Sequence, residues 1–253
     1  MDNTVKFTGK ADIYAKYRPS YPDALLDYLI TAGGLPESAH VADIGAGTGK
    51  LSERLLAGSL RVTAVEPNDD MRGEAEKWLG ARNGYQSVSG TAEHTGLPDG
   101  TVDLVTVAQA FHWFDPIAFK AECRRILKPG AQVALIWNTS GQETALHADV
   151  KELFQRLHPE SDETAPSGTD HTPVSTLESF YENGTFETTD FPNDRTLTLE
   201  AFIGFNLSKS YSPQRGDASY GAFAEELTAL FHKHSRNGTL VLHEVTRCNL
   251  GRV

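Results

Sequence analysis

The chain has few cysteines, comparatively few basic residues and no long apolar run, and each scarcity removes a class of protein. Two cysteines in 253 residues, Cys123 and Cys248, form neither a disulfide scaffold nor the paired spacing of a zinc site. With 23 basic against 34 acidic residues the net charge is −11, so the phosphate backbone of a nucleic acid would be repelled. No stretch is apolar enough to span a bilayer, and the N-terminus lacks the apolar segment of a signal peptide. We therefore expect a cytoplasmic protein with neither a membrane nor a nucleic-acid partner.

The nine histidines also lack the spacing of a metal site, so we expect no metal. What the chain does have is ordinary for a globular protein. Hydrophobic residues make up 39% and charged residues 23%. A chain of 253 residues is long enough to bury one sizeable α/β core.

Residues 41–50, with the sequence VADIGAGTGK, predict an apolar strand, a glycine-rich turn and the start of a helix. Glycines in such a turn allow tight or left-handed backbone, and they let a ligand approach without meeting a Cβ atom. The free N–H groups at the start of the helix suit a polar or anionic ligand group. The turn therefore predicts a ligand site.

Three ligands compete for this turn. A phosphate-binding P-loop would need glycine where Ile44 stands and serine or threonine where Leu51 stands. The dinucleotide fingerprint would need glycine in place of Lys50. Asp43, at the strand end, is awkward beside a pyrophosphate but suits the ammonium group of an amino acid. This pattern favours S-adenosylmethionine, which carries adenosine and an amino acid but no phosphate.

A second apolar strand, predicted at residues 61–65, ends in Glu66. An acidic residue at the end of the second strand, about twenty residues after the glycines, holds a ribose diol by hydrogen bonds. Because NAD sites use the same device, Glu66 supports a nucleoside without choosing between the two cofactors.

Four segments in this order, VADIGAGTGKLSERLL, VTAVEPNDDMR, GTAEHTGLPDGTVDLVTVAQAFHWFD and LKPGAQVALIWN, resemble the class I S-adenosylmethionine-dependent methyltransferases. They look most like the branch with small-molecule acceptors, which contains trans-aconitate and ubiquinone-type enzymes. The resemblance implies a Rossmann-like, doubly wound α/β fold with helices on both faces of a seven-stranded sheet. Its implied strand order is 3-2-1-4-5-7-6, with the last strand antiparallel. It also implies one domain over 1–253: an N-terminal lid and helix at 1–32, a cofactor-binding core at 33–138, and an acceptor-side cap with closing strands at 139–253.

The resemblance further implies S-adenosyl-L-methionine as cofactor and S-adenosyl-L-homocysteine as product. In the family the N-terminal arm covers the cofactor, although the same tyrosine-rich arm could simply be packed. Many relatives have an acidic or amide residue where Thr91 stands, so the partner of the adenine amino group is left open between Thr91 and Glu93. The residues expected to bind the cofactor are Tyr14, Arg18, Asp43, Gly45, Ala46, Gly47, Glu66, Pro67, Met71, Thr91, Ala92, Glu93 and Gln109.

The strand predicted at residues 101–107 ends in the sequence AQAFHWF, and side chains at the carboxyl ends of such strands face the crevice of an open sheet. Trp113 is expected to line the acceptor pocket. His112 is the candidate general base if the acceptor arrives protonated, and its alternative is to cap the next helix or pack under Trp113. Arg18 is the candidate anchor if the acceptor is an acid.

Beyond residue 140 the pattern predicts helices at 143–157, 199–207 and 220–234, strands at 185–191 and 240–248, and a mobile loop at 158–176. The acceptor stays open, as does the choice between monomer and homodimer. Three alternatives remain: a cofactor-binding module without turnover, a methyltransferase acting on a macromolecule, and an NAD(P)-dependent oxidoreductase. The last is least favoured because the third glycine is misplaced and no Tyr-x-x-x-Lys follows.

Overall fold

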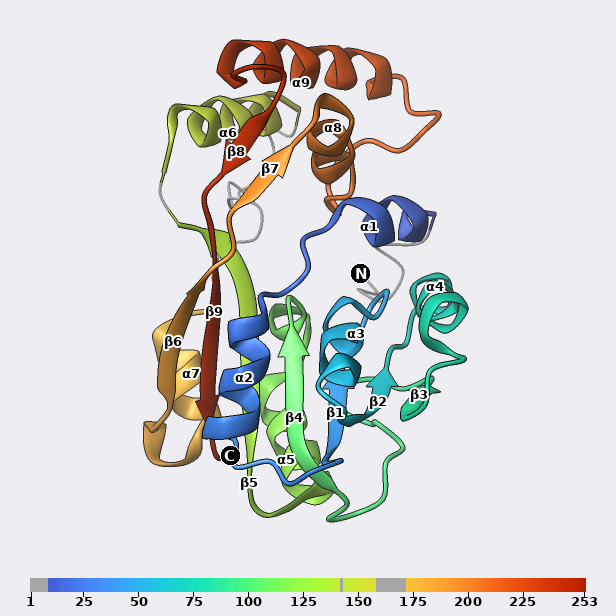
Figure 1. Ribbon diagram of the computed structural model, residues 1–253, viewed down its shortest axis with the longest axis vertical. Coiled ribbons are helices and arrows are strands. Elements are labelled where there is room, and N and C mark those ends of the chain that lie inside the picture. The colour runs from blue at the N-terminus through green and yellow to red at the C-terminus, as the bar shows by residue number, and fades with distance from the viewer. Residues whose placement is uncertain (1–8, 142, 158–171) are drawn as a thin grey trace.

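The computed structural model describes residues 9–141, 143–157 and 172–253 of the chain (Figure 1). The first half alternates strands and helices, and the second half adds helices and antiparallel strands. In chain order the elements are α1 (Ala11–Tyr17), α2 (Asp23–Ala32), β1 (His40–Ile44), α3 (Lys50–Ala57), β2 (Arg61–Val65), α4 (Asp69–Leu79), β3 (Tyr85–Val88), β4 (Val102–Ala108), a 3₁₀ turn η2 (Phe111–Trp113), α5 (Pro116–Ile126), β5 (Leu127–Ser140), α6 (Ala145–Leu157), α7 (Val174–Phe180), η3 (Glu182–Gly184), β6 (Glu187–Pro192), β7 (Arg195–Leu197), α8 (Leu199–Leu207), α9 (Tyr220–His234), β8 (Leu240–Leu242) and β9 (Glu244–Gly251).

The main sheet has seven strands in the order β3-β2-β1-β4-β5-β9-β6. The five strands from β3 to β5 are parallel, and β9 runs antiparallel to both β5 and β6. The predicted order is confirmed, since β6 and β9 are the sixth and seventh strands of this sheet along the chain. The fold is the Rossmann-like, doubly wound one.

The central strands are apolar on both faces because helices cover both. Every residue of β1 after His40 is buried, as expected for a parallel strand inside two helical layers. One face packs against α2 and α3 through Leu25, Leu29, Leu51 and Leu55. The other face packs against α5 and α7, where Phe119 and Phe180 stack with ring centroids 5.6 Å apart.

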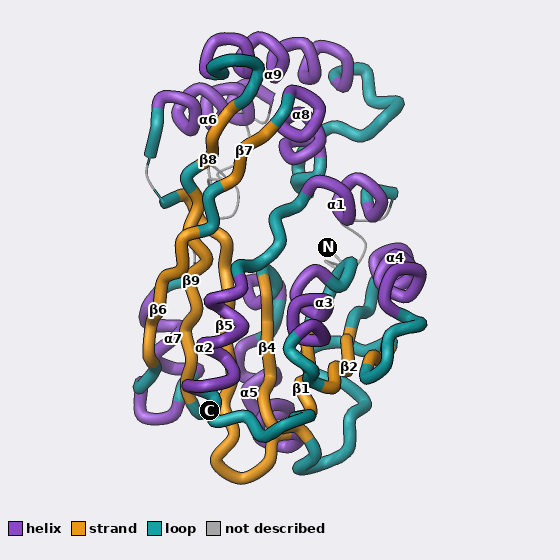
Figure 2. Tube along the Cα trace, in the orientation of Figure 1, coloured by secondary structure: helices purple, strands orange, loops and turns teal. Residues whose placement is uncertain are grey.

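A second layer stands beyond the carboxyl ends of the parallel strands (Figures 1 and 2). We call this layer the cap: α6, α8 and α9 with the two-stranded β7–β8 sheet. It has its own apolar core, which includes Leu153, Phe202, Phe223 and Leu227. The short helix α1 lies between the cap and the sheet and contacts both α8 and α4. None of the helices in the described ranges is long and apolar enough to cross a bilayer.

Three predictions for the C-terminal half need correction. The single strand expected at 240–248 is two strands: β8 pairs with β7 in the cap, and β9 pairs with β5 and β6. The short strand β7 was missed, because three residues are too few to show the alternating pattern that predicts a strand. The loop expected at 158–176 lies mostly outside the described residues, and its last three residues begin α7, after Pro173 at the helix N-cap.

Candidate cofactor site

A crevice opens at the carboxyl ends of β1, β2 and β4, and α1 borders it on the cap side. It has two adjoining parts that share Tyr14, Gly45, Gly47, Ala108 and Gln109 in their walls. The part toward β2 encloses about 810 Å³ and the part toward α1 and Asn138 about 460 Å³, and both volumes include space that is open to solvent.

The glycine-rich turn forms the floor between the two parts. Gly45, Gly47 and Gly49 have φ angles of 67°, 57° and 79°, a region that favours glycine. A Cβ atom on Gly45 would lie 2.7 Å from the Cβ of Ala110, and one on Gly49 would lie 2.6 Å from Cδ1 of Leu79. The turn therefore needs glycine for close packing at its two ends and for its conformation throughout.

Glu66 follows β2 and is held in place by backbone donors. Its Oε2 accepts from the N–H of Gly47 and its Oε1 from the N–H of Asn68, both at 2.9 Å. Burial raises the pKa of Glu66, while the two N–H donors and the nearby Arg72 oppose that rise. A carboxylate oxygen can accept more than one hydrogen bond, so Glu66 keeps acceptor capacity beyond these two.

Asp43 is the second-last residue of β1, close to the turn, and is almost completely buried, with 1% of its surface exposed. Its oxygens accept from the hydroxyls of Ser52 at 2.7 Å and Thr106 at 3.0 Å. Burial raises the pKa of Asp43 to about 6, even though both hydroxyls favour the charged form. Asp43 borders the crevice, so its charge acts from within the wall.

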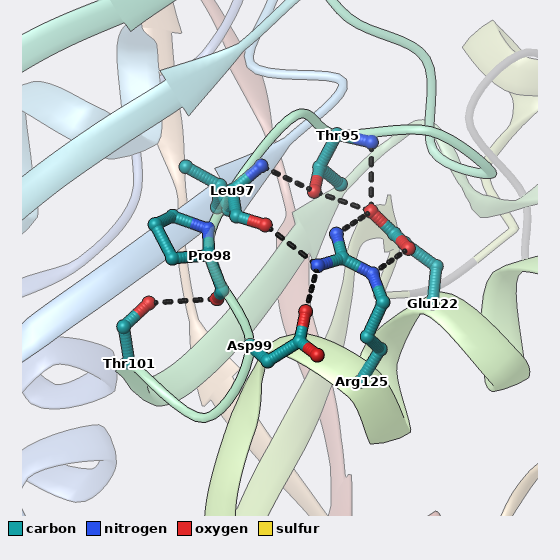
Figure 3. A network of polar contacts seen from close by, with 7 residues as sticks. All are labelled: Thr95, Leu97, Pro98, Asp99, Thr101, Glu122 and Arg125. Carbon is teal, nitrogen blue, oxygen red and sulfur yellow. Dashed lines mark hydrogen bonds and ion pairs between the residues drawn. The ribbon is translucent and has the colours of Figure 1, made fainter.

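The outer wall of the larger part is the loop that follows β3, and a polar network fastens it to α5 (Figure 3). Glu122 on α5 accepts from the N–H of Thr95 at 2.8 Å and from its hydroxyl at 2.5 Å. Arg125 pairs with Glu122 and donates to the carbonyl of Leu97 at 2.8 Å. Glu93, on the crevice side of this loop, accepts from the N–H of Asp115 at 3.0 Å. The sequence carried no signal for this network, because its partners are far apart in the chain.

The two α1-side residues expected at the site also lie there. Tyr14 borders both parts of the crevice and Arg18 borders the smaller one. The guanidinium of Arg18 lies 4.9 Å from the centre of the Tyr14 ring and donates from Nη2 to the carbonyl of Ser208 at 3.2 Å. Gln109 has a φ of 59° and donates from Nε2 to the carbonyl of Asn138 at 3.2 Å. These contacts join the arm, the cap and the ends of β4 and β5 around one space.

The structure brings together every residue that the sequence predicted for the cofactor, and Trp113 with them, in the wall of one crevice. His112 is different: it is exposed, borders neither part, and lies beside Trp113 with ring centroids 4.5 Å apart. The expectation that the whole segment after β4 faces the crevice is wrong for Phe111, which is buried in the core. The reason is the 3₁₀ turn, which points successive side chains in different directions.

Sequence reasoning missed several residues of the wall. Asn68 had a usable signal, because an asparagine before a helical run is a typical N-cap, and its side chain does accept from the N–H of Met71 at 3.0 Å. The position of the others is revealed only by the folded chain. The missed wall residues are Pro19, Thr48, Lys50, Leu51 and Asn68.

This geometry can be compared with known proteins. A family model described as a methyltransferase domain matches residues 42–135, which contain the glycine-rich turn, Glu66 and β4. A relative from Mycobacterium tuberculosis, named an uncharacterized methyltransferase, is 32% identical over 250 residues, covering 98% of this chain and 95% of the relative. The chain belongs to the class I S-adenosylmethionine-dependent methyltransferases.

Two further likenesses extend over much of the methyltransferase chain. A Dictyostelium discoideum protein, provisionally named a methyltransferase, is 31% identical over 211 residues, covering 81% of this chain and 76% of its own. A solved structure from Anaeromyxobacter dehalogenans, provisionally described as a type II methyltransferase, has a TM-score of 0.64 and 27% identity, covering 93% of this chain and 98% of its own. The likeness thus includes the cap. The predicted small-molecule branch stays a prediction.

Proposed function

We propose that this methyltransferase binds S-adenosylmethionine in the crevice and transfers its methyl group to a small-molecule acceptor, releasing S-adenosylhomocysteine. One observation carries the proposal: two buried carboxylates, Asp43 and Glu66, flank the glycine-rich turn from the ends of neighbouring strands. This wall suits a ligand with a sugar diol and a cationic amino acid. It suits a pyrophosphate poorly, which disfavours the dinucleotide alternative.

In this proposal each part of the cofactor has its own group of residues. Glu66 accepts from the ribose hydroxyls, while Pro67, Met71 and Ala92 enclose the adenine, with Thr91 or Glu93 beside its amino group. The turn residues Gly45, Ala46 and Gly47 lie along the amino-acid part, with Asp43 behind them. Tyr14, Arg18 and Gln109 close that end. The placement is supported by the lining of the crevice, where all of these residues meet.

In this reaction the main task of the protein is to position the reacting groups. Methyl transfer from a sulfonium is an in-line displacement, and the leaving sulfide departs neutral, so the cofactor carries the driving force. Holding nucleophile, methyl and sulfur in line supplies roughly 7–11 kcal/mol of barrier lowering. Here α1 borders the crevice and packs against α8 of the cap, and in our proposal α1 and the cap orient the acceptor and keep water away.

A general base is needed only where the acceptor arrives protonated. His112 is the candidate, but it borders neither part of the crevice. A carboxylate acceptor would need no base at all. Replacing His112 by glutamine is the direct test, because an unchanged pH–rate profile would remove the residue from the mechanism.

Binding and turnover test the proposal separately. In calorimetry we expect S-adenosylmethionine and S-adenosylhomocysteine to bind, and NAD and NADP not to bind. The reverse result would favour the oxidoreductase alternative. Transfer of a labelled methyl group from the cofactor into a small-molecule metabolite extract then separates an enzyme from a cofactor-binding module without turnover. Labelling of protein or tRNA instead would contradict a small-molecule acceptor.

A further inference from the structure

The cap contains a buried lysine that has no counter-ion among the residues the structure describes. Lys209 follows α8, and only 2% of its surface is exposed. Its ammonium nitrogen lies 4.6 Å from the centre of the Phe154 ring and 5.4 Å from that of Phe205. Within the described parts of the chain no carboxylate pairs with this ammonium group and no carbonyl accepts from it. Aromatic faces alone stabilise a cation only partly.

Two further cations surround the same ring of Phe205. The guanidinium carbon of Arg195 lies 4.4 Å from the ring centre and that of Arg18 lies 5.8 Å from it. Arg195 is neutralised by Glu244, to which it donates through both Nε and Nη2. Arg18 has no such partner among the described residues, and its Nε is buried without an acceptor. Within the described ranges, three cations thus lie around the Phe205 ring with one carboxylate beside them, and that carboxylate is already paired.

A neighbouring lysine shows what a structural role looks like in this part of the fold. Lys10 is also buried, and its ammonium donates to the carbonyls of Lys209 at 2.9 Å, Ser210 at 3.3 Å and Ser212 at 2.5 Å. Lys10 thus ties the N-terminal arm to the segment after α8. Lys209 has none of these acceptors, although a buried charge without them is costly.

The charge of Lys209 is accordingly disfavoured in the ligand-free protein. Burial first, and the positive charge of Arg18 next, hold the pKa of Lys209 well below its ordinary value, and the carboxylate of Glu244 opposes them only in part. Arg195 adds to the repulsion. A methionine or leucine would fill the space between Phe154 and Phe205 without this cost. An anionic ligand group would offset the free-energy cost of burying this charge, because it would give both Lys209 and Arg18 a partner.

The position of Arg18 connects this region to the cofactor crevice. Arg18 borders the smaller part of the crevice together with Gln109 and Asn138, and it reaches Phe205 on the other side. A positive region therefore runs from the crevice into the cap of a protein whose net charge is −11. Such a local field concentrates anionic ligands against the overall charge.

We propose that Lys209 and Arg18 form an anion site, and that the acceptor of this methyltransferase is a small carboxylic acid anchored there by a carboxylate. The apolar part of the acid packs against Phe154 and Phe205. A carboxylate held by two cations is a weak nucleophile, so a second anionic oxygen of the acid, a carboxylate or an ionised phenol directed toward the crevice, receives the methyl. The new oxygen–carbon bond replaces the methyl carbon–sulfur bond of the cofactor, and S-adenosylhomocysteine leaves as a neutral sulfide. The assignment of the acid as acceptor rests on the proposed function.

The test uses matched acids and amides. Aliphatic dicarboxylates of four to eight carbons and hydroxybenzoates, each with its neutral amide, are titrated into the full-length protein with and without S-adenosylhomocysteine. We expect at least one acid to bind and to raise the melting temperature, while its amide does not. In Lys209→Met the affinity for that acid falls at least tenfold, and the affinity for S-adenosylhomocysteine stays within twofold of the wild type.

Stability of the ligand-free variants gives a second, independent readout. Lys209→Met should raise the melting temperature, because it removes a buried charge without a partner. Lys10→Met is the matched control and should lower it, because three carbonyls lose their donor. A lowered melting temperature in Lys209→Met would indicate a structural role and contradict the site.

The other outcomes are equally decisive. An equal loss of S-adenosylhomocysteine affinity in Lys209→Met would show that Lys209 holds the carboxylate of the cofactor instead of an acceptor. Binding of amides as tight as that of acids, or no binding of any acid to the wild type, would overturn the anion site. Failure of the wild type to bind S-adenosylhomocysteine while an acid still binds would refute the proposed function and leave the anion site intact.

Discussion

The two sides of the crevice treat buried charge in opposite ways. On the sheet side, Asp43 and Glu66 are both buried, and each carboxylate oxygen accepts a hydrogen bond from the protein. On the cap side, Nε of Arg18 is buried without an acceptor, and the ammonium of Lys209 contacts aromatic rings and has no acceptor among the described residues. The comparison suggests that the sheet side is organised before any ligand arrives, whereas the cap side is completed by one.

The difference follows from where the partners come from. The sheet-side carboxylates accept hydrogen bonds from backbone N–H groups and hydroxyls of the neighbouring strands, turns and helix of the sheet layer, so folding of the sheet organises them. Lys209 and Arg18 meet around Phe205 only because α1 and the cap pack together. When a ligand binds a preorganised site, little free energy is lost in ordering the residues of that site. The cap side instead holds a charge imbalance that a ligand can relieve.

The largest effect should come from removing the carboxylate that we place on the ribose. Glu66→Ala takes away two acceptors for the ribose hydroxyls and also frees the N–H groups of Gly47 and Asn68 that hold the turn. Hydrogen bonds to a charged group contribute about 1.5–3 kcal/mol each. We expect the Kd for S-adenosylhomocysteine to rise roughly a thousandfold, a loss of about 4 kcal/mol.

The matched control is Glu74→Gln, a half-buried carboxylate in α4 that pairs with Lys77 and lies outside the crevice wall. Its affinity for S-adenosylhomocysteine should equal that of the wild type. Calorimetry measures both variants. If Glu66→Ala bound the product as tightly as Glu74→Gln, the sheet side would not be the organised half of the site.

The sequence predicted the sheet side far better than the cap side, for the same reason. Asp43, the glycine-rich turn and Glu66 lie within one strand–turn–helix–strand stretch, so a local pattern contains the whole arrangement. The cap depends on contacts between distant residues, such as Lys209 with Phe154 on α6 and with Arg18 after α1. The three-residue strand β7 exists only because β8 pairs with it. Composition and spacing cannot reveal a charge imbalance that tertiary packing creates.

The next effect concerns the packing of the turn itself. Gly45→Ala would place a methyl group 2.7 Å from the Cβ of Ala110 and 3.1 Å from the ring of Phe114, at a φ of 67°. Overlap and backbone strain together should lower the free energy of unfolding by about 3 kcal/mol. The control is Gly34→Ala, which has a similar φ of 60° but open space around it, and which should cost about 1 kcal/mol. Urea unfolding of the two variants measures the difference. Equal losses would show that conformation, and not packing, makes Gly45 necessary.

Acid should destabilise the protein at the loop that follows β3, because Glu122, which fastens this loop to α5, becomes protonated. Burial works against its charge, but hydrogen bonds from Arg125 and Thr95 lower the pKa of Glu122 to about 2. Because this pKa is depressed in the folded state, the stabilisation is present above the ordinary value near 4.5 and is lost as the pH falls toward 2. Glu122→Gln should therefore lose about 2 kcal/mol relative to the wild type at pH 7, and the gap should narrow toward pH 3.

The control for that loss is Asp99→Asn, since Asp99 is an exposed carboxylate on the same arginine (Figure 3). Its unfolding free energy should stay within about 0.5 kcal/mol of the wild type. Urea unfolding across pH 3–7 follows both variants. A constant gap between Glu122→Gln and the wild type over that range would mean that Glu122 does not titrate as the contacts require.

The smallest effect tests whether Asp43 acts on the cofactor through its charge. The pKa of Asp43 is raised to about 6 in the ligand-free protein, so part of the population is protonated below neutral pH. The ammonium of the cofactor favours the charged form, and binding at lower pH must therefore release a proton. The affinity for S-adenosylhomocysteine should fall by about tenfold, or about 1.4 kcal/mol, for each pH unit below 6 and stay level above it.

Asp43→Asn removes the titration but keeps an acceptor for one of the two hydroxyls, so its affinity should be lower than that of the wild type at pH 7.5 and independent of pH between 5 and 7.5. Calorimetry at several pH values gives both profiles. If the profiles ran parallel, the pH dependence would belong to another group, and Asp43 would serve only to fasten Ser52 and Thr106 behind the turn.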